Sequence, residues 1–205
     1  MEGPDPPPPE PAGEPSPSDL WLLDRVRRGA PGAWRAVFER HGARVWRFLR
    51  AQLGDRSAAD EGTQETFVRA HQGLLAGTPV ERLLPWLLGI ARNVAWEQRR
   101  QRARTIPMEE PVEDGAPDAS PDPEALLLAG ETRALLARAL ARLGDERRAA
   151  LLLRIDQGLD YGDIATVLGW SVARVRNELH RGRSQLRLCL IEELSSKEDV
   201  HAARV

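Results

Sequence analysis

The sequence predicts an all-α protein of two small helical domains joined by a flexible acidic linker, with a helix-turn-helix in the C-terminal domain. Three observations predict this fold class. Apolar residues recur at helical spacing along most of the 205 residues, enough chain for two small domains. A proline-rich acidic segment interrupts the pattern at residues 105–123. Two short amphipathic patterns then meet at Gly169, and the second is rich in arginine.

The N-terminal domain is expected at residues 18–104, after a leader at residues 1–17 that is predicted to be disordered. The leader is polar and contains a run from Pro6 to Pro9, which excludes a helix. Helical stripes then follow with breaks at residues 29–32, Gly42 and Gly54, and two further helices are expected at about 57–75 and 85–104. The side chains expected to face this core are Leu20, Leu23, Val26, Trp34, Val37, Phe38, His41, Val45, Trp46, Phe48, Leu49, Leu53, Ala58, Phe67, Val68, Leu74, Trp86, Leu87, Ile90, Ala91 and Val94.

Charge is distributed unevenly along the chain. Residues 105–123 form the predicted linker, because they combine several prolines and acidic residues with no basic residue. The acids of residues 1–19 and 105–124 account for twelve negative charges, so the rest of a chain with net charge −2 carries +10. A basic remainder is compatible with a nucleic-acid partner.

The C-terminal domain is expected at residues 124–194, followed by a frayed tail at 195–205. Helices at about 126–143 and 145–157 precede the helix-turn-helix. Asp160 and Ser171 stand where N-caps are needed, and Gly169 supplies a permissive backbone between the two helices. The first helix of the motif presents Tyr161, Ile164, Ala165 and Leu168 on one face, and the second presents Val172, Val175 and Leu179.

The second helix of the motif carries polar residues that suit a major groove. Arginine, asparagine and histidine side chains can bind phosphates and base edges, so duplex DNA is the first hypothesis. The alternative is an ordinary solvated helix face. The residues concerned are Arg174, Arg176, Asn177, Glu178, His180, Arg181 and Arg183.

Composition favours a protein of the cytoplasm. The chain has no apolar run of the length needed to cross a bilayer and no N-terminal signal peptide. Its single cysteine, Cys189, cannot form an internal disulfide and is expected in the core. No phosphate-binding loop or metal-spaced cysteine and histidine set is present, so we expect no enzymatic activity, no metal and no cofactor.

Four segments in order resemble the extracytoplasmic-function (ECF) sigma factors, which are two-domain initiation subunits of bacterial RNA polymerase. Residues 59–70 resemble sigma region 2.2, and residues 86–100 resemble regions 2.3 and 2.4. Residues 140–154 resemble region 4.1, and residues 158–183 resemble region 4.2. The resemblance implies a sigma factor that binds core RNA polymerase and promoter DNA, and directs promoter recognition, DNA opening and initiation.

The resemblance also implies the roles of individual residues. Glu61, Gln64 and Glu65 match positions that bind the polymerase clamp, although without the family a solvated helix face is the preferred explanation of them. Asn93 matches the position that captures a flipped base of the minus-10 element, and Arg92, Arg99 and Arg100 would hold phosphates. The minus-35 contacts fall on Arg174, Arg176, Asn177, His180, Arg181 and Arg183. Many members have an anti-sigma partner, which this sequence does not identify.

Several positions depart from the family pattern. Gly62 lies within the region 2.2 helix, where glycine costs about 1 kcal/mol relative to alanine. Arg174 and Glu178 differ from the usual residues of the recognition helix, so this chain's promoter sequence should differ from that of its relatives. Glu178 is expected either to accept from a cytosine amino group or to pair with Arg174 or Arg181. The alternative function is a stand-alone helix-turn-helix regulator whose N-terminal bundle senses a signal or dimerises.

Overall fold

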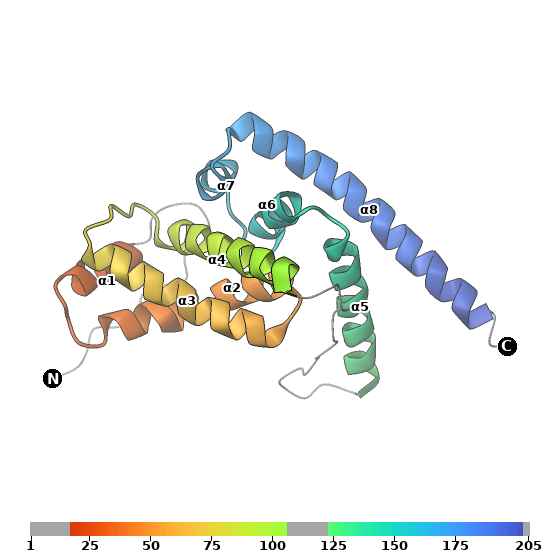
Figure 1. Cartoon of the computed structure of the whole chain (residues 1–205), viewed down its shortest axis with the longest axis horizontal. Coiled ribbons are helices and arrows are strands. Elements are labelled where there is room, and N and C mark those ends of the chain that lie inside the picture. Colours follow the sequence, from red (N-terminus) through yellow and green to blue (C-terminus); the bar gives the residue numbers. More distant parts are fainter. Residues whose placement is uncertain (1–16, 106–122, 203–205) are drawn as a thin grey trace.

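The computed structural model describes residues 17–105 and 123–202, and all the regular elements in these ranges are α-helices. The N-terminal half contains α1 (Pro17–Arg27), α2 (Ala33–Leu53), α3 (Arg56–Leu75) and α4 (Leu83–Thr105). The C-terminal half contains α5 (Pro123–Ala141), α6 (Asp145–Ile155), α7 (Tyr161–Leu168) and α8 (Val172–Ala202). Figure 1 shows α2, α3 and α4 packed as a bundle, with α6 and α7 against it and α8 running along the outside. The all-α class is confirmed, whereas the predicted leader and most of the linker lie outside the described residues.

The helix boundaries follow local chemistry. Asp55 caps α3 by accepting from the Ala58 amide at 2.8 Å, and Asp160 caps α7 by accepting from the Asp163 amide at 2.8 Å. The Ser171 hydroxyl accepts from the Arg174 amide at 3.2 Å, and Gly169 has a φ of 66°. The turn predicted between the helices of the motif is confirmed, because a φ in this region favours glycine.

Two predicted boundaries are wrong. Gly42 does not break the chain, because α2 is one continuous helix in which Gly42 is buried beside the Phe38 ring. The predicted frayed tail after about Ser195 is instead part of α8, which continues to Ala202.

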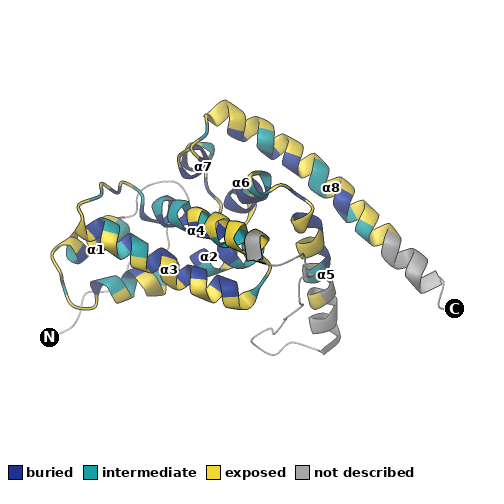
Figure 2. Ribbon diagram, in the orientation of Figure 1, coloured by how far each residue is buried: buried dark blue, intermediate teal, exposed yellow. Residues whose placement is uncertain are grey.

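A few predicted core positions are also wrong. Val68 is 51% exposed, Phe38 46%, Leu20 48% and Val172 44%, because each lies at the edge of its helix's buried face. The other predicted core positions of the described helices are buried or partly buried, as Figure 2 shows along α2, α3 and α4. Cys189 is buried, as predicted.

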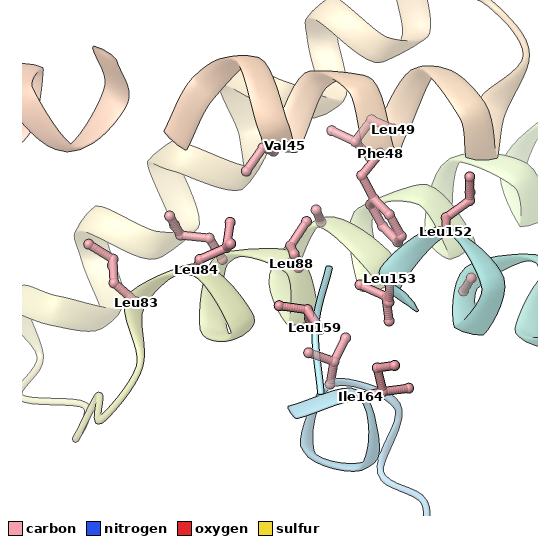
Figure 3. Packing of buried hydrophobic residues seen from close by; sticks show 14 of the residues in the cluster. Val45, Phe48, Leu49, Leu83, Leu84, Leu88, Leu152, Leu153, Leu159 and Ile164 are labelled. Carbon is pink, nitrogen blue, oxygen red and sulfur yellow. The ribbon is translucent and has the colours of Figure 1, made fainter. Parts of the chain in front are cut away.

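The cores of the two halves join into one cluster. Val45, Phe48 and Leu49 of α2 and Leu84 and Leu88 of α4 belong to the same cluster as residues of the C-terminal half, namely Leu152, Leu153, Leu159 and Ile164. Figure 3 shows these side chains meeting between the helices. Apolar burial is the main favourable contribution to folding, so this contact holds the two halves together in a closed arrangement.

Polar contacts reinforce the closed arrangement. Arg148 of α6 is 4% exposed and donates to the carbonyls of Leu140, Ala141 and Leu143 at 2.7–2.9 Å. It also donates to the Gln52 carbonyl of α2 at 3.2 Å. Burial, and next the nearby charge of Arg99, lower the pKa of Arg148 to about 10. Arg148 remains charged at neutral pH and ties the end of α2 to the C-terminal half.

Candidate nucleic-acid interface

The exposed face of α3 carries the residues assigned to polymerase binding. Glu61, Gln64 and Glu65 are all exposed, whereas Thr63, Thr66 and Phe67 on the opposite face are buried. Val68 lies one turn after Gln64 and adds an apolar side chain to the same face. This face of α3 therefore combines acidic, amide and apolar groups, and its apolar part was missed because Val68 was predicted in the core.

One arginine links α3 to α4 beside this face. Arg69 donates to Glu65 at 2.7 Å, and it forms two hydrogen bonds with Glu97 of α4 at 3.1 and 2.7 Å. The hydrogen bonds that Arg69 donates to Glu97 and then to Glu65 raise the pKa of Arg69, and Arg69 in turn lowers the pKa of Glu97. Glu65 is therefore held in place before any partner binds.

Gly62 does not interrupt α3. A Cβ atom at this position would lie 3.4 Å from Leu49 Cδ1 and 3.5 Å from Gln98 Nε2, so α3 lies close to both α2 and α4 here. The glycine departure from the family pattern is accommodated by close helix packing.

The four residues assigned to the minus-10 element lie on α4. Asn93 and Arg100 are exposed, and Arg92 and Arg99 are half-buried. Trp96 lies on the same stretch and is 60% exposed, whereas Trp86 packs against the core. An amide, a free indole face and three guanidinium groups are thus grouped on one helix.

The C-terminal half partly covers this face of α4. A cleft of about 630 Å³ separates α4 from α6 and α8, and its lining includes Asn93 and Trp96. Arg99 pairs with Asp145 at 2.8 Å and Arg92 pairs with Glu146 at 3.8 Å, both across the cleft. Two of the arginines assigned to promoter DNA therefore bind carboxylates of the chain itself.

The loop between α3 and α4 is attached to the helix-turn-helix. Arg82 donates to Asp160, the N-cap of α7, at 3.2 Å, and also to Asp163. The Asp163 amide and then Arg82 lower the pKa of Asp160, whereas burial raises the pKa of Asp163 despite the charge of Arg82. Arg82 thus holds the loop of the N-terminal half against the first helix of the motif.

The recognition helix presents its assigned residues to solvent. The side chains of Arg174, Arg176, Asn177, His180, Arg181 and Arg183 are all exposed, while Val175 and Leu179 are buried against the rest of the domain. Arg174 stacks over Trp170 with its guanidinium carbon 4.2 Å from the ring centroid, and pairs with Glu146 at 2.9 Å. Glu178 pairs with Arg181 at 3.5 Å, as one alternative predicted, and more closely with Arg147 of α6 at 2.9 Å.

Comparison with known proteins gives matches across both halves. Residues 37–105 match the family model of sigma-70 region 2, and residues 133–186 match that of sigma-70 region 4. The chain is 33% identical over 180 residues to the ECF RNA polymerase sigma factor SigE of Mycolicibacterium smegmatis, covering 87% of this chain and 69% of the relative. The chain belongs to the ECF RNA polymerase sigma factors. It is therefore a subunit that directs RNA polymerase to promoters, which decides against a stand-alone regulator.

Other relatives of this sigma factor agree. SigL of Mycobacterium tuberculosis is 33% identical over 159 residues, covering 77% of this chain and 89% of the relative. The structure of CnrH with the cytosolic domain of CnrY has a TM-score of 0.65 at 23% identity, covering 85% of this chain and 98% of that one. RpoE of Bartonella quintana, solved with the anti-sigma factor NepR, has a TM-score of 0.55 at 21% identity, covering 83% and 92%. At these identities the two structures establish the fold alone.

Sequence reasoning missed the residues that connect the halves of the sigma factor. Arg82, Asp145 and Glu146 received no role, and neither did Arg147, which connects α6 to α8 within the C-terminal half. The partners of these four residues lie 28 to 81 residues away in the sequence. No local pattern identifies such pairs. In the described part of the chain, no helix is long and apolar enough to cross a membrane.

Proposed function

We propose that the sigma factor binds core RNA polymerase through the α3 face formed by Glu61, Gln64, Glu65 and Val68. The support is geometric: the face is exposed along about two turns, and its opposite side is buried in the bundle. Acidic groups surrounding an apolar side chain suit a basic partner surface. Reversing Glu61 and Glu65 to lysine should abolish co-purification with core polymerase while the fold is retained.

A matched control is available in the same half. Glu39 and Glu81 are exposed acids on other elements, α2 and the loop between α3 and α4, so Glu39→Lys with Glu81→Lys makes the same change in net charge. The control should co-purify like the native protein. Equal loss in both variants, or no loss in either, would remove the assignment of this face.

The α4 face is the proposed minus-10 site. Asn93 can donate to and accept from a base edge, Trp96 offers an exposed ring for stacking, and Arg92, Arg99 and Arg100 can neutralise phosphates. Asn93→Ala should leave closed-complex formation intact and reduce strand opening, measured by permanganate reactivity of unpaired thymines. An equal reduction in both steps would contradict base capture by Asn93.

The α8 face is the proposed minus-35 site. The observation that carries this proposal is that the assigned polar residues are exposed on a capped helix whose opposite side is anchored in the core. Arg176, Asn177 and His180 have side chains suited to base edges, and Arg174, Arg181 and Arg183 to phosphates. Substituting Arg176 and Arg181 together by alanine should reduce initiation from promoters that depend on a minus-35 element, and unaltered initiation would refute the assignment.

In the closed arrangement the chain cannot bind the two promoter elements at the same time. Elements centred near positions −10 and −35 lie about 25 base pairs apart, or roughly 85 Å at 3.4 Å per base pair. The α4 face instead lies across one cleft from α6 and from the edge of α8 that carries Glu178. The 17 residues from 106 to 122 have a maximum reach of about 60 Å, so the chain permits the halves to separate on the promoter.

A further inference from the structure

The edge of α8 that faces α6 is defined by a close helix crossing. A Cβ atom on Gly182 would lie 2.9 Å from Arg147 Cγ and 3.1 Å from Leu151 Cδ1, so α6 packs directly over this glycine. Glu178 lies one turn before Gly182, and Gln185 lies about one turn after it. These three positions share one side of the helix, and that side faces α6.

Arg147 occupies this edge with three contacts. Its Nε donates to Glu178 Oε2 at 3.0 Å, and a second nitrogen approaches the same carboxylate at 2.9 Å. A third donates to Gln185 Oε1 at 2.7 Å. The planar guanidinium suits such a set of acceptors, and its alkyl stem is held over Gly182.

Glu178 differs in both charge and environment from the other polar residues of the recognition surface. Its side chain is only 18% exposed, whereas the residues of α8 assigned to DNA are all exposed. It is the one acidic residue between Val172 and Arg187 of α8. An unpaired carboxylate here would repel DNA phosphates, and Arg147 supplies the compensating charge from a neighbouring helix.

We propose that Arg147 is a positioning residue for Glu178, which holds the Glu178 carboxylate at the α6 side of the recognition helix and keeps it from opposing DNA. Glu178 then does not recognise a base, and sequence discrimination in this helix belongs to Arg176, Asn177 and His180. The inference rests on the proposed minus-35 function of α8. It gives a joint role to Glu178, which differs from the residue usual in the family, and to Arg147, which lies outside the helix-turn-helix.

The test measures binding of the holoenzyme, formed with core RNA polymerase, to a pool of promoters randomised in the minus-35 element. Arg147→Ala should weaken binding to every sequence about ten-fold without changing base preference, because the bare carboxylate repels phosphate and draws Arg181 away from DNA. Arg147→Ala combined with Glu178→Gln should return to within about two-fold of the native protein. Glu178→Gln alone should keep the native base preference.

Two results would overturn the inference. If Glu178→Gln relaxes the preference at one base pair, Glu178 recognises that base. If the double variant binds as poorly as Arg147→Ala, the effect comes from lost packing of the arginine stem and not from the carboxylate. Arg142→Ala, which removes the 2.6 Å pair between the turn after α5 and Glu192 of α8, is the matched control and should bind normally.

The underlying function is tested separately in the same pool. Arg176→Ala should relax preference at one position of the element if α8 reads the minus-35 sequence. Unchanged preference in Arg176→Ala would refute the proposed function itself. A change in Arg176→Ala without rescue in the double variant would refute only the pairing of Arg147 with Glu178.

Discussion

Neutralising Asp145 and Glu146 should increase the affinity of the free sigma factor for single-stranded minus-10 DNA. The Asp145→Asn and Glu146→Gln variant loses the pairs with Arg99 at 2.8 Å and with Arg92 at 3.8 Å, both of which join α6 to α4. The two acidic side chains are 44% and 56% exposed, so solvent screens them and each pair contributes about 0.5 kcal/mol. The closed arrangement should therefore weaken by about 1 kcal/mol, which is about five-fold in an equilibrium constant.

The assay is fluorescence anisotropy of a labelled single-stranded oligonucleotide that carries the minus-10 sequence, titrated with the free protein. A single strand isolates the α4 face from the α8 face, which is proposed to bind duplex DNA. Because removing two acids favours DNA binding through net charge alone, the control is Glu192→Gln with Glu193→Gln. Glu193 pairs with Arg138 of α5 and Glu192 with Arg142 just after α5, both within the C-terminal half and not across the cleft.

The expected result is about five-fold tighter binding beyond any gain in the control. Equal gains in both variants would mean that net charge alone explains the change. Unchanged affinity in the Asp145 and Glu146 variant would show that these pairs do not restrain the α4 arginines, and the reasoning from the closed arrangement would fail.

Three further predictions concern stability. Arg148→Met should lower the free energy of unfolding by about 3 kcal/mol, because it leaves buried carbonyl groups without a donor. The melting temperature measured by circular dichroism should fall by about 10 °C, and a shift below 2 °C would contradict the role of Arg148 as the donor to these carbonyls. Gly182→Ala should destabilise the protein by about 1 kcal/mol, because crowding against α6 outweighs the gain in helix propensity. Gly89, which has open space around it, is the control, and Gly89→Ala should be stabilising. If the urea midpoints of the two variants shift in the same direction, the prediction is refuted. Burial raises the pKa of Asp19, but the hydrogen bond and charge of His41 outweigh burial and lower this pKa below the usual 3.8. Asp19 therefore stabilises the fold near neutral pH, and this contribution is lost as the pH falls through the lowered pKa. The stability difference between the native protein and Asp19→Asn, about 1–2 kcal/mol at pH 7, should then disappear in acid denaturation, and a constant difference would refute the linkage.

The sequence was sufficient wherever the information is local. Asp160, Ser171 and Gly169 identified the turn of the motif because caps and left-handed glycines act within a few residues. Periodicity located most of the core, but it placed Val68 inside because a helical stripe has no sharp edge. The break at Gly42 was wrong because packing in the bundle outweighs a propensity cost of about 1 kcal/mol.

The site needed tertiary structure for a different reason. The predicted DNA-binding residues of α4 and α8 lie on exposed or half-buried helix faces. Their helical spacing, which places them largely off the apolar stripe, had predicted this. Their intramolecular partners were not predictable, since Arg99 meets Asp145 only through the folding of two halves on each other. The charge of Glu178 was visible in the sequence, but its partner Arg147 was not, and this left open whether the carboxylate faced a base or a neighbouring side chain.

The joined core has a practical consequence for dividing this chain. A cut between residues 105 and 123 would leave Leu84 and Leu88 at the surface of one fragment, and Leu159 and Ile164 at the surface of the other. Each fragment would then expose an apolar patch prone to association, and the two fragments mixed in solution would bind each other through these patches. Each half of this protein is thus a binding partner for the other half of the same chain, and the two are not independent modules. Fragment experiments should begin by substituting Leu84 and Leu88 in one half, or Leu159 and Ile164 in the other.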